Sequence, residues 1–580
     1  MRILYVIMGL VMGLVMGLVM GSVNLVANNI SVSNVLVTGR DVSAGVNNAA
    51  NFTKVQFNIT WENSWRTSYT SNWDAAWIFV KYRVRPSGTW QHAWLNNTGH
   101  STGSIGADGT IANGLQTPGT AFNATTNPVL GVFLHRASNG AGTFTSNSVQ
   151  LRWNYGANGL NDNDSVDVKV FAIEMVYVPQ GSFYVGSGGV PGTGASEMGS
   201  FTNGSWTTGA TIPYQVTSEA ALGIDNADGK LWGTFSGNTT SMHTIGNVPS
   251  DAEATLPAAY PKGFAAFYCM KYETSQGQYR DFLNTLTRTQ QANRVTMDGT
   301  VGRYAGGIQW LGSSPWWSAS EVNNFTSPNV RTGLRLVADP GGNSPRTYAC
   351  DLNPSATLPT GVNQSDDGEW LPMGSLSWPD ACAYMEWSGL RPMTELEFEK
   401  ACRGNQSPSA EEFAWGNTTI TAATSRTNSG TNSETTNTTG ANVSYNFTNL
   451  PSGGREEGAW RVGAFAGAAT TRQQSGAGYY GIMDLSGNMW EQCVAVSDAT
   501  ARSYTGLHGD GMLGDNGHAT IANWPGLSSG EVTTASGTGL RGGAWTTSIA
   551  RTRVSDRNSA LNQYQYRRPD NSFRGVRTAE

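Results

Sequence analysis

Side chains able to do chemistry gather in the last hundred residues of the chain. In MDLSGNMWE, residues 483–491, the carboxylate of Glu491 follows a glycine-containing turn. A carboxylate beside backbone carbonyl oxygens is an arrangement that a hard cation such as calcium prefers. A hydrogen-bonded turn without metal is the alternative interpretation of the same residues, so the turn is a candidate cation site.

A second candidate site lies in LRGGAWTTSIARTRVSDRN, residues 540–558. Its arginines are suited to clamp carbonyl and carboxylate oxygens and so to close the C-terminal hairpin. Between and after them lie hydroxyl, amide and phenol side chains, which form adaptable binding surfaces. The residues of this predicted ligand or partner surface are Thr546, Thr547, Ser548, Asn558, Tyr564, Tyr566 and Asn571.

Several common catalytic and metal-binding patterns are missing from the sequence. It contains no HExxH motif, no P-loop and no CxxC pair. Its five cysteines are Cys269, Cys350, Cys382, Cys402 and Cys493. Two of them fall in helical patterns, where a buried small hydrophobe is the common role of cysteine, so we expect buried thiols rather than a disulfide framework.

Composition limits the class of protein. A chain of 580 residues is long enough for two or more domains. Its net charge of −6 gives no sign of nucleic-acid binding. Only 13% of the residues are charged, against about 25% in ordinary soluble domains. A surface of neutral polar residues repels its neighbours weakly, which favours self-association.

The first 27 residues, MRILYVIMGLVMGLVMGLVMGSVNLVA, are predicted to be a signal peptide. A retained membrane anchor is the alternative, because the apolar run is long. No later segment is comparably apolar, so we expect the mature chain to be secreted or on the cell surface, with no membrane contact after cleavage.

Residues 28–172 are predicted to form an all-β sandwich. Segments such as TKVQFNITW and SVQLRWNYG alternate apolar and polar residues between turns rich in Gly, Asn and Thr. Residues 173–580 are different in character. Thr274 is a predicted helix N-cap, Pro379 and Gly389 bound a second helix, and Thr394 with Glu397 form a capping box that opens a third. Long insertions near 187–258, 300–365 and 417–455 are predicted to be loops.

The second half resembles a known family over about residues 174–580. Its motifs MVYVPQGSFYVG, KYETSQGQYRDFLN, SWPDACAYMEWSGLRPMTELEFEKACRG, FAWGN and GIMDLSGNMWE, followed by the C-terminal segment above, occur in the order typical of the sulfatase-modifying-factor family. The resemblance implies a formylglycine-generating-enzyme domain, an irregular α+β variant of the C-type-lectin fold. Residues 28–172 are not covered by it.

The resemblance also bears on metals. Catalytic members bind copper(I) through two cysteines, five residues apart, that follow the Gly-Gly-aromatic turn. At that spacing this chain has Thr547 and Thr552, and hydroxyls bind copper(I) poorly, so we expect no copper and no copper-dependent oxidation. The family often holds structural calcium. By resemblance, one site comprises Glu491 with backbone oxygens near Ser486, Gly487 and Met489, and the other comprises Asn442 and Glu457.

Two functional hypotheses follow. The first is an exported non-catalytic binding or structural protein, which recognises a protein or glycan or assembles with copies of itself into a filament or surface layer. Related lectin-fold domains also serve as diversified binding proteins whose variable positions lie in this C-terminal hairpin. The alternative is an exported enzyme of the same family with altered metal-dependent chemistry.

Overall fold

The structure is a computed structural model that describes residues 29–190, 197–204, 209–233, 254–296, 299–304, 330–354, 358, 360–446, 457–467 and 471–580. The predicted signal peptide and parts of the three predicted insertions lie outside these residues. Within them, no helix is long and apolar enough to cross a bilayer.

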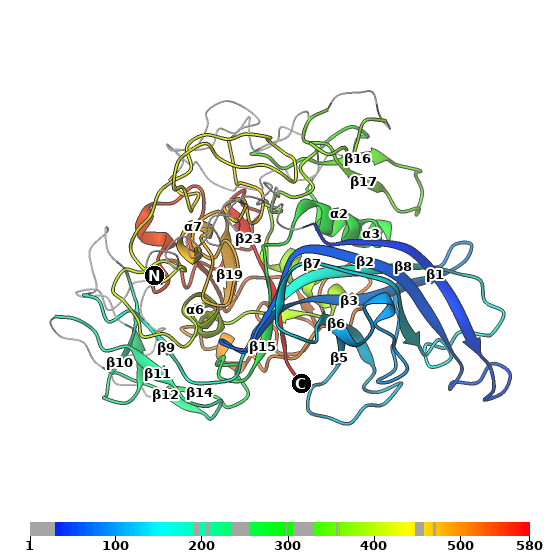
Figure 1. The fold of residues 1–580 in the computed structure, drawn as a ribbon, viewed down its shortest axis with the longest axis horizontal. Helices are drawn as coiled ribbons and strands as arrows, with labels where there is room; N and C mark the ends of the chain where they lie inside the picture. Colours follow the sequence, from blue (N-terminus) through cyan, green and yellow to red (C-terminus); the bar gives the residue numbers. More distant parts are fainter. Residues whose placement is uncertain are drawn as a thin grey trace, which may run out of the picture.

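The N-terminal region is built from eight strands in two layers (Figure 1). One layer has the order β1-β2-β7, and the other has the order β5-β6-β3-β8, with β4 paired to β3. All of these pairs are antiparallel. The strands are β1 Ser31–Asp41, β2 Phe52–Thr67, β3 Asn72–Val84, β4 Gln91–His92, β5 Gly109–Leu115, β6 Val129–Arg136, β7 Gly140–Trp153 and β8 Val166–Val178.

An apolar core lies between the two layers. Strand β2 alternates half-buried and buried positions, which places Phe57 and Trp61 inside. They share a cluster with Ile78 of β3, Leu134 of β6 and Leu151 of β7. The predicted order of a two-layered β region followed by an α+β domain is confirmed.

The second layer does not end at the N-terminal region. Strand β8 pairs with β3 from Val166 to Val176, and its last residues, Met175 to Val178, also pair with β15 (Phe267–Met270). Beyond β15 the sheet continues through β24 (Gly575–Thr578) and β18 (Arg391–Pro392). The predicted domain boundary at residue 172 lies inside β8. One strand therefore belongs to the sheet of both halves.

Smaller sheets and short helices make up the rest of the C-terminal half. Short strands occur inside two of the stretches predicted as loops, where four of them form a sheet, two form a hairpin and one pairs with a strand just before the first stretch. The strands of the smaller sheets are β9 Phe183–Val185, β10 Phe201–Asn203, β11 Tyr214–Val216, β12 Leu222–Ile224, β13 Leu231–Gly233, β14 Ala254–Leu256, β16 Leu334–Ala338, β17 Thr347–Cys350, β19 Trp490–Val494, β20 Leu527–Ser528, β21 Glu531–Val532, β22 Thr538–Arg541 and β23 Asn571–Ser572. The helices of this half are α2 Gln276–Leu283, α3 Arg288–Arg294, α5 Trp378–Ser388, α6 Glu395–Arg403, α7 Arg472–Ser475 and the 3-10 helices η4 Ala501–Ser503 and η5 Ile549–Thr552, while the 3-10 helix η1 Gly103–Asp108 lies between β4 and β5.

The helix signals were predicted well, with one correction. Pro379 occupies the first turn of α5, Gly389 ends it in the left-handed conformation, and Thr394 opens α6 through a capping box. The N-cap of α2 is Ser275, not Thr274. Thr274 is fully buried and directs its hydroxyl at the carbonyl of Phe573, so its neighbour performs the capping.

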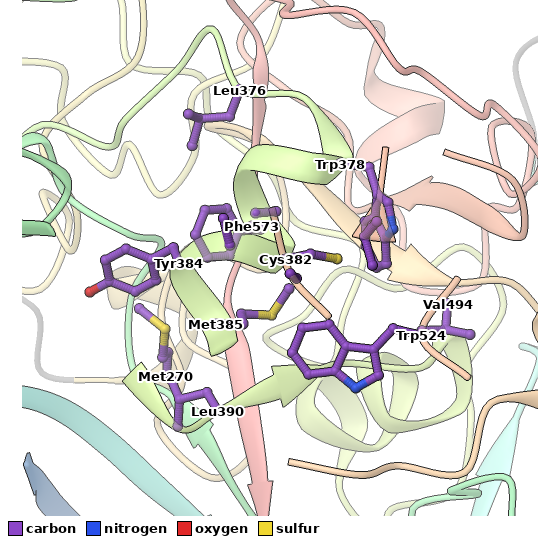
Figure 2. Packing of buried hydrophobic residues seen from close by; sticks show 14 of the residues in the cluster. Met270, Leu376, Trp378, Cys382, Tyr384, Met385, Leu390, Val494, Trp524 and Phe573 are labelled. Atoms are coloured by element: carbon purple, nitrogen blue, oxygen red, sulfur yellow. The ribbon is translucent and has the colours of Figure 1, made fainter. Parts of the chain in front are cut away.

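Helix α5 lies at the centre of the main core, and every one of its residues is buried. Figure 2 shows Cys382 and Met385 of this helix among Trp524, Phe573 and Met270, which come from three other segments. The opposite face of the N-terminal sheet packs into the same core through Trp77 and Phe79. All five cysteines are buried free thiols, as predicted.

Polar contacts reinforce this junction between the halves. The indole of Trp77 donates to the carbonyl of Ser388 at 2.8 Å, and Arg577 lies 4.6 Å from its ring centroid. Lys271 joins Glu174 at 2.9 Å and Asp74 at 3.6 Å, with all three side chains buried. Such ion pairs are costly to break singly, because the remaining charge is left buried.

We expect Trp77→Phe to lower the free energy of unfolding by about 2 kcal/mol, because it removes a buried hydrogen bond and leaves a void. Hydrogen exchange during urea unfolding should show β2 and α5 losing protection at the same, lowered urea concentration. If α5 keeps its native midpoint while β2 shifts, the halves unfold separately and the shared sheet does not couple them.

Candidate functional site

The predicted cation turn leads directly into β19. Asp484, Gly487 and Asn488 all have positive φ, between 59° and 81°, which folds the chain tightly before Trp490. A Cβ at Gly487 would collide with the carbonyl of Ser444, so this position requires glycine. The turn therefore gathers its carbonyl oxygens and side chains within a small volume.

Three buried carboxylates surround one arginine beneath this turn. Arg574 donates from Nε to Oε1 of Glu491 at 2.6 Å. Asn488 donates from its amide to both carboxylate oxygens of Glu273, at 3.2 and 3.3 Å. Asp484 accepts a hydrogen bond from the backbone N–H of Gly463 at 2.6 Å.

The negative charge of this cluster exceeds its positive charge. Burial raises the pKa of Glu273, of Asp484 and of Glu491, and Asp484 further raises the pKa of the other two, while Arg574 opposes the shift. Within the described residues, Oε2 of Glu491 and Nη2 of Arg574 have no hydrogen-bond partner. Burial therefore favours the protonated carboxyls here, and Arg574 together with Arg461 at Asp484 opposes that effect on the pKa.

The residues of the first predicted cation site lie in one turn and at the start of β19, and a cation there stays a prediction. Glu491 lies beside the turn that carries Gly487 and Met489, whereas the hydroxyl of Ser486 accepts from the backbone of Ala414 at 3.0 Å. In the described part of the chain, no three His, Cys, Asp or Glu side chains are arranged to hold a metal by themselves. A cation at this turn would depend on backbone carbonyls.

Sequence reasoning missed Asp484 and Glu273. Asp484 precedes Gly487 in the same DLSG turn, so its position was a readable signal. Glu273 is far away in sequence and gave no local signal.

The second predicted cation site is less developed. The amide of Asn442 accepts from the N–H of Thr421 at 3.0 Å and donates to the carbonyl of Gln473 at 3.1 Å, so it joins backbone segments. Glu457 is half-buried and follows residues 447–456, which lie outside the described residues. Within the described residues, Asn442 and Glu457 share no hydrogen bond.

The acidic residues of α6 have structural roles. Glu395 pairs with Arg541 at 3.1 Å and with Arg557 at 2.8 Å, and Glu399 pairs with Arg541 at 2.7 Å. All of these side chains are fully buried. The network joins α6 to β22 and to the C-terminal segment, so Arg541 and Arg557 hold these elements together.

The two threonines at the expected copper positions are satisfied locally. The hydroxyl of Thr547 donates to the carbonyl of Ala544 at 3.0 Å and accepts from the Ala544 N–H at 2.9 Å. Thr552 is fully buried and donates to the carbonyl of Ile549 at 2.8 Å. Both hydroxyls stabilise turns and present no soft ligand.

The predicted binding surface is only partly exposed. Ser548 is exposed, and Thr546, Thr547, Asn558, Tyr564 and Tyr566 are half-buried. Asn571 is not part of this surface. It is fully buried because β23 pairs in parallel with β19, which places Asn571 opposite Trp490.

The segment GLSSG, residues 526–530, matches the GxSxG pattern of hydrolase nucleophile elbows. Here it forms the tight connection of the β20–β21 hairpin, with Ser528 paired to Glu531. A nucleophile elbow joins a strand to a helix, so this segment does not present a catalytic serine.

The sulfatase-modifying factor enzyme 1-like domain family matches residues 164–579. The chain belongs to this family. The match begins just before β8 and leaves the preceding strands of the N-terminal region outside.

Curated relatives in the family are distant. The chain is 25% identical over 158 residues to formylglycine-generating enzyme of Bos taurus, covering 26% of this chain and 34% of the relative. It is 28% identical over 139 residues to inactive C-alpha-formylglycine-generating enzyme 2 of Mus musculus, covering 24% and 37%. The chain thus spans about a third of these relatives. Treponema denticola variable protein 1 is a similar solved structure with 13% identity and a TM-score of 0.24, covering 70% of this chain and 96% of that one.

Arg574 holds the buried carboxylates together, and its loss tests that role. We expect Arg574→Met to lower the free energy of unfolding by about 3–5 kcal/mol, because it leaves Glu491 without its counter-charge. Arg83→Met, which removes a partly exposed arginine paired with the half-buried Asp167 at 2.8 Å, should cost about 1 kcal/mol or less. Denaturant unfolding measures both, and equal losses would contradict a special role for Arg574.

Proposed function

We propose that this family member is an exported, non-catalytic binding or structural protein that associates with copies of itself. The observation that carries the proposal is the local satisfaction of Thr547 and Thr552, which leaves the expected copper positions without thiolates. A relative in the family carries the name of an inactive enzyme, which supports the same view.

Calcium is the proposed structural cofactor. The carboxylates of Asp484 and Glu491 and the carbonyl oxygens of Gly487 and Met489 would hold it, and hard oxygen ligands suit this ion. Its charge would balance the excess of buried carboxylates. Arg574 and Asn488 then orient Glu491 and Glu273 around the turn.

Strand β1 is the proposed surface for self-association. It lies at the edge of its sheet, and Val35, Leu36 and Val37 are 36%, 44% and 43% exposed. Edge strands usually carry charges or proline that block pairing with other chains, but β1 has only Arg40 and Asp41 at its end. If β1 of a second copy paired in antiparallel register with Leu36 opposite Leu36, Val35 would face Val37 and no like charges would face each other.

The C-terminal surface is the proposed place for a different extracellular partner, a protein or a glycan. Its exposed hydroxyl and its half-buried phenols and amide can adapt to varied ligands. The competing function is an exported enzyme with altered metal-dependent chemistry.

Substituting Leu36 with lysine tests self-association. We expect the mature wild-type chain to form ordered oligomers in electron micrographs and in sedimentation velocity, and Leu36→Lys to remain monomeric, because an inserted charge blocks edge pairing. Val46→Lys is the matched control, since Val46 is 86% exposed and lies outside β1. A monomeric wild-type chain, or oligomers that survive Leu36→Lys, would reject the β1 interface.

Metal removal tests the cofactor. We expect about one tightly held calcium at the turn, and saturating calcium should stabilise the EDTA-treated protein by about 3 kcal/mol at a hundredfold excess over the Kd. Glu491→Gln and Asp484→Asn should abolish the effect, while Asp366→Asn should preserve it. Thermal unfolding measures the stabilisation by calcium, and elemental analysis measures the amount of bound calcium. Tightly held copper or iron in place of calcium would support the enzyme instead.

A further inference from the structure

Lys271 directly follows β15 and lies at the junction between the two halves. Its Nζ is 2.9 Å from Oε2 of Glu174 in β8 and 3.6 Å from Oδ2 of Asp74 in β3. The exposed fractions of the Lys271, Glu174 and Asp74 side chains are 3%, 1% and 0%. Strand β8 lies between β3 and β15 in the sheet. One amine and two carboxyls from three neighbouring strands thus meet in one buried volume.

A lysine is unusual among the buried ion pairs of this chain. In the described part of the chain, the other buried pairs use arginine, such as Arg541 with Glu395 and Arg574 with Glu491. A guanidinium stays protonated and holds carboxylates in a fixed fork, whereas a lysine amine becomes a nucleophile once it loses its proton. Lysine at this position therefore allows a reaction that arginine would not.

The carboxyl of Asp74 is held by donors on both oxygens. Its Oδ1 accepts from the Trp65 N–H and from the Ser64 hydroxyl, both at 2.9 Å. Ser64 itself accepts from Nε of Arg136 at 3.1 Å, which strengthens its hydroxyl as a donor. Oδ2 accepts from the indole of Trp61 at 2.9 Å. Donors in these positions stabilise the negative charge that develops on a carboxyl oxygen when a nucleophile adds to the carbon.

Burial favours the protonation states that such an addition needs. It raises the pKa of Asp74, opposed by Lys271, and so favours the neutral carboxyl that an amine can attack. It also raises the pKa of Glu174, whose Oε1 has no hydrogen-bond partner within the described residues. Burial lowers the pKa of Lys271, but Glu174, Tyr272 and Asp74 together raise it above its ordinary value, so the ammonium dominates at rest. Glu174 must therefore accept a proton from Lys271 before the attack, and we expect one slow reaction per chain.

The surroundings favour condensation of the amine with a carboxyl. A buried ammonium–carboxylate pair carries a desolvation cost, whereas an amide is neutral. The ring centroids of Trp65 and Tyr272 lie 4.9 and 5.4 Å from Nζ of Lys271, and these rings help to exclude the water that would hydrolyse an amide. The fold also holds the two reactants together, which removes the entropy cost of their encounter.

We propose that Lys271 and Asp74 condense to an amide that covalently joins the end of β15 to β3, with Glu174 as the acid–base residue. The Lys271 ammonium gives a proton to Glu174, and its nitrogen forms a bond to Cγ of Asp74. The bond from Cγ to Oδ2 breaks, and Oδ2 leaves as water with the carboxyl proton and a second proton from the nitrogen, which Glu174 relays. The products are a neutral amide, one water and a protonated Glu174, so no oxidant or co-reactant takes part. This inference does not depend on self-association, on calcium or on the C-terminal surface.

Intact mass spectrometry of the denatured mature chain tests the link. We expect the wild type to be lighter than Lys271→Arg by one water, after allowance for the residue change, because arginine keeps the charge but does not condense. The comparison cancels the position of signal cleavage and any other modification that both chains carry. Digestion of the wild type should yield a branched peptide, in which tandem mass spectrometry locates the bond between Lys271 and Asp74.

Two further variants separate chemistry from folding. Glu174→Gln has nearly the same shape but accepts no proton, so most of this chain should keep its unlinked mass. Lys81→Met is the matched control, because Lys81 is a buried lysine of β3 whose ammonium donates to the carbonyl of Gly511 at 2.6 Å. It should lose water as the wild type does, and thermal unfolding should verify that each variant is folded.

Four results would overturn the proposal. They are a wild-type chain with its unlinked mass, a bond from Lys271 to Glu174 in place of Asp74, a complete link in Glu174→Gln, and loss of the link in folded Lys81→Met.

Discussion

Strand β8 forms hydrogen bonds to β3 along one edge and, at its end, to β15 along the other. A strand between two neighbours has no free edge there, so neither half can complete this sheet without the other. The side chains on the two faces of β8 also pack into two different cores. Ala172 packs against the core between the N-terminal layers, whereas Ile173 belongs to the main core of the family domain. The two regions are thus one folded body.

Local sequence signals were sufficient to predict helix ends where a residue caps the helix next to it in the chain. Pro379, Gly389 and the Thr394–Glu397 box fix helix ends through bonds within three or four residues, and these were predictable. Thr274 and Ser275 are adjacent and chemically alike, so only the contact with Phe573 decides which one caps α2. The family resemblance pointed to Thr547 and Thr552 as the positions where a thiol pair was expected.

Features that depend on distant pairing could not be predicted. The sharing of β8 rests on register with strands from both halves, which a single sequence does not encode locally. Glu273 meets Glu491 and Asp484 only after the sheet has formed, so the sequence indicated the turn but not the cluster of three carboxylates. Asn571 was predicted to lie on the surface because its parallel pairing with β19 joins segments that are distant in the chain, which the local sequence does not reveal.

A large share of the few ionic groups of this chain lies in its interior, where Glu395, Glu399, Glu491 and their arginines are out of reach of water. Dissolved salt at about 0.1 M screens the interaction between exposed charges that lie more than about 10 Å apart, but it screens buried pairs weakly. The outer surface, being mostly neutral, offers salt little to screen. The fold and its contacts with other molecules should therefore respond to hydration, through osmolytes or excluded cosolvents, far more than to ionic strength.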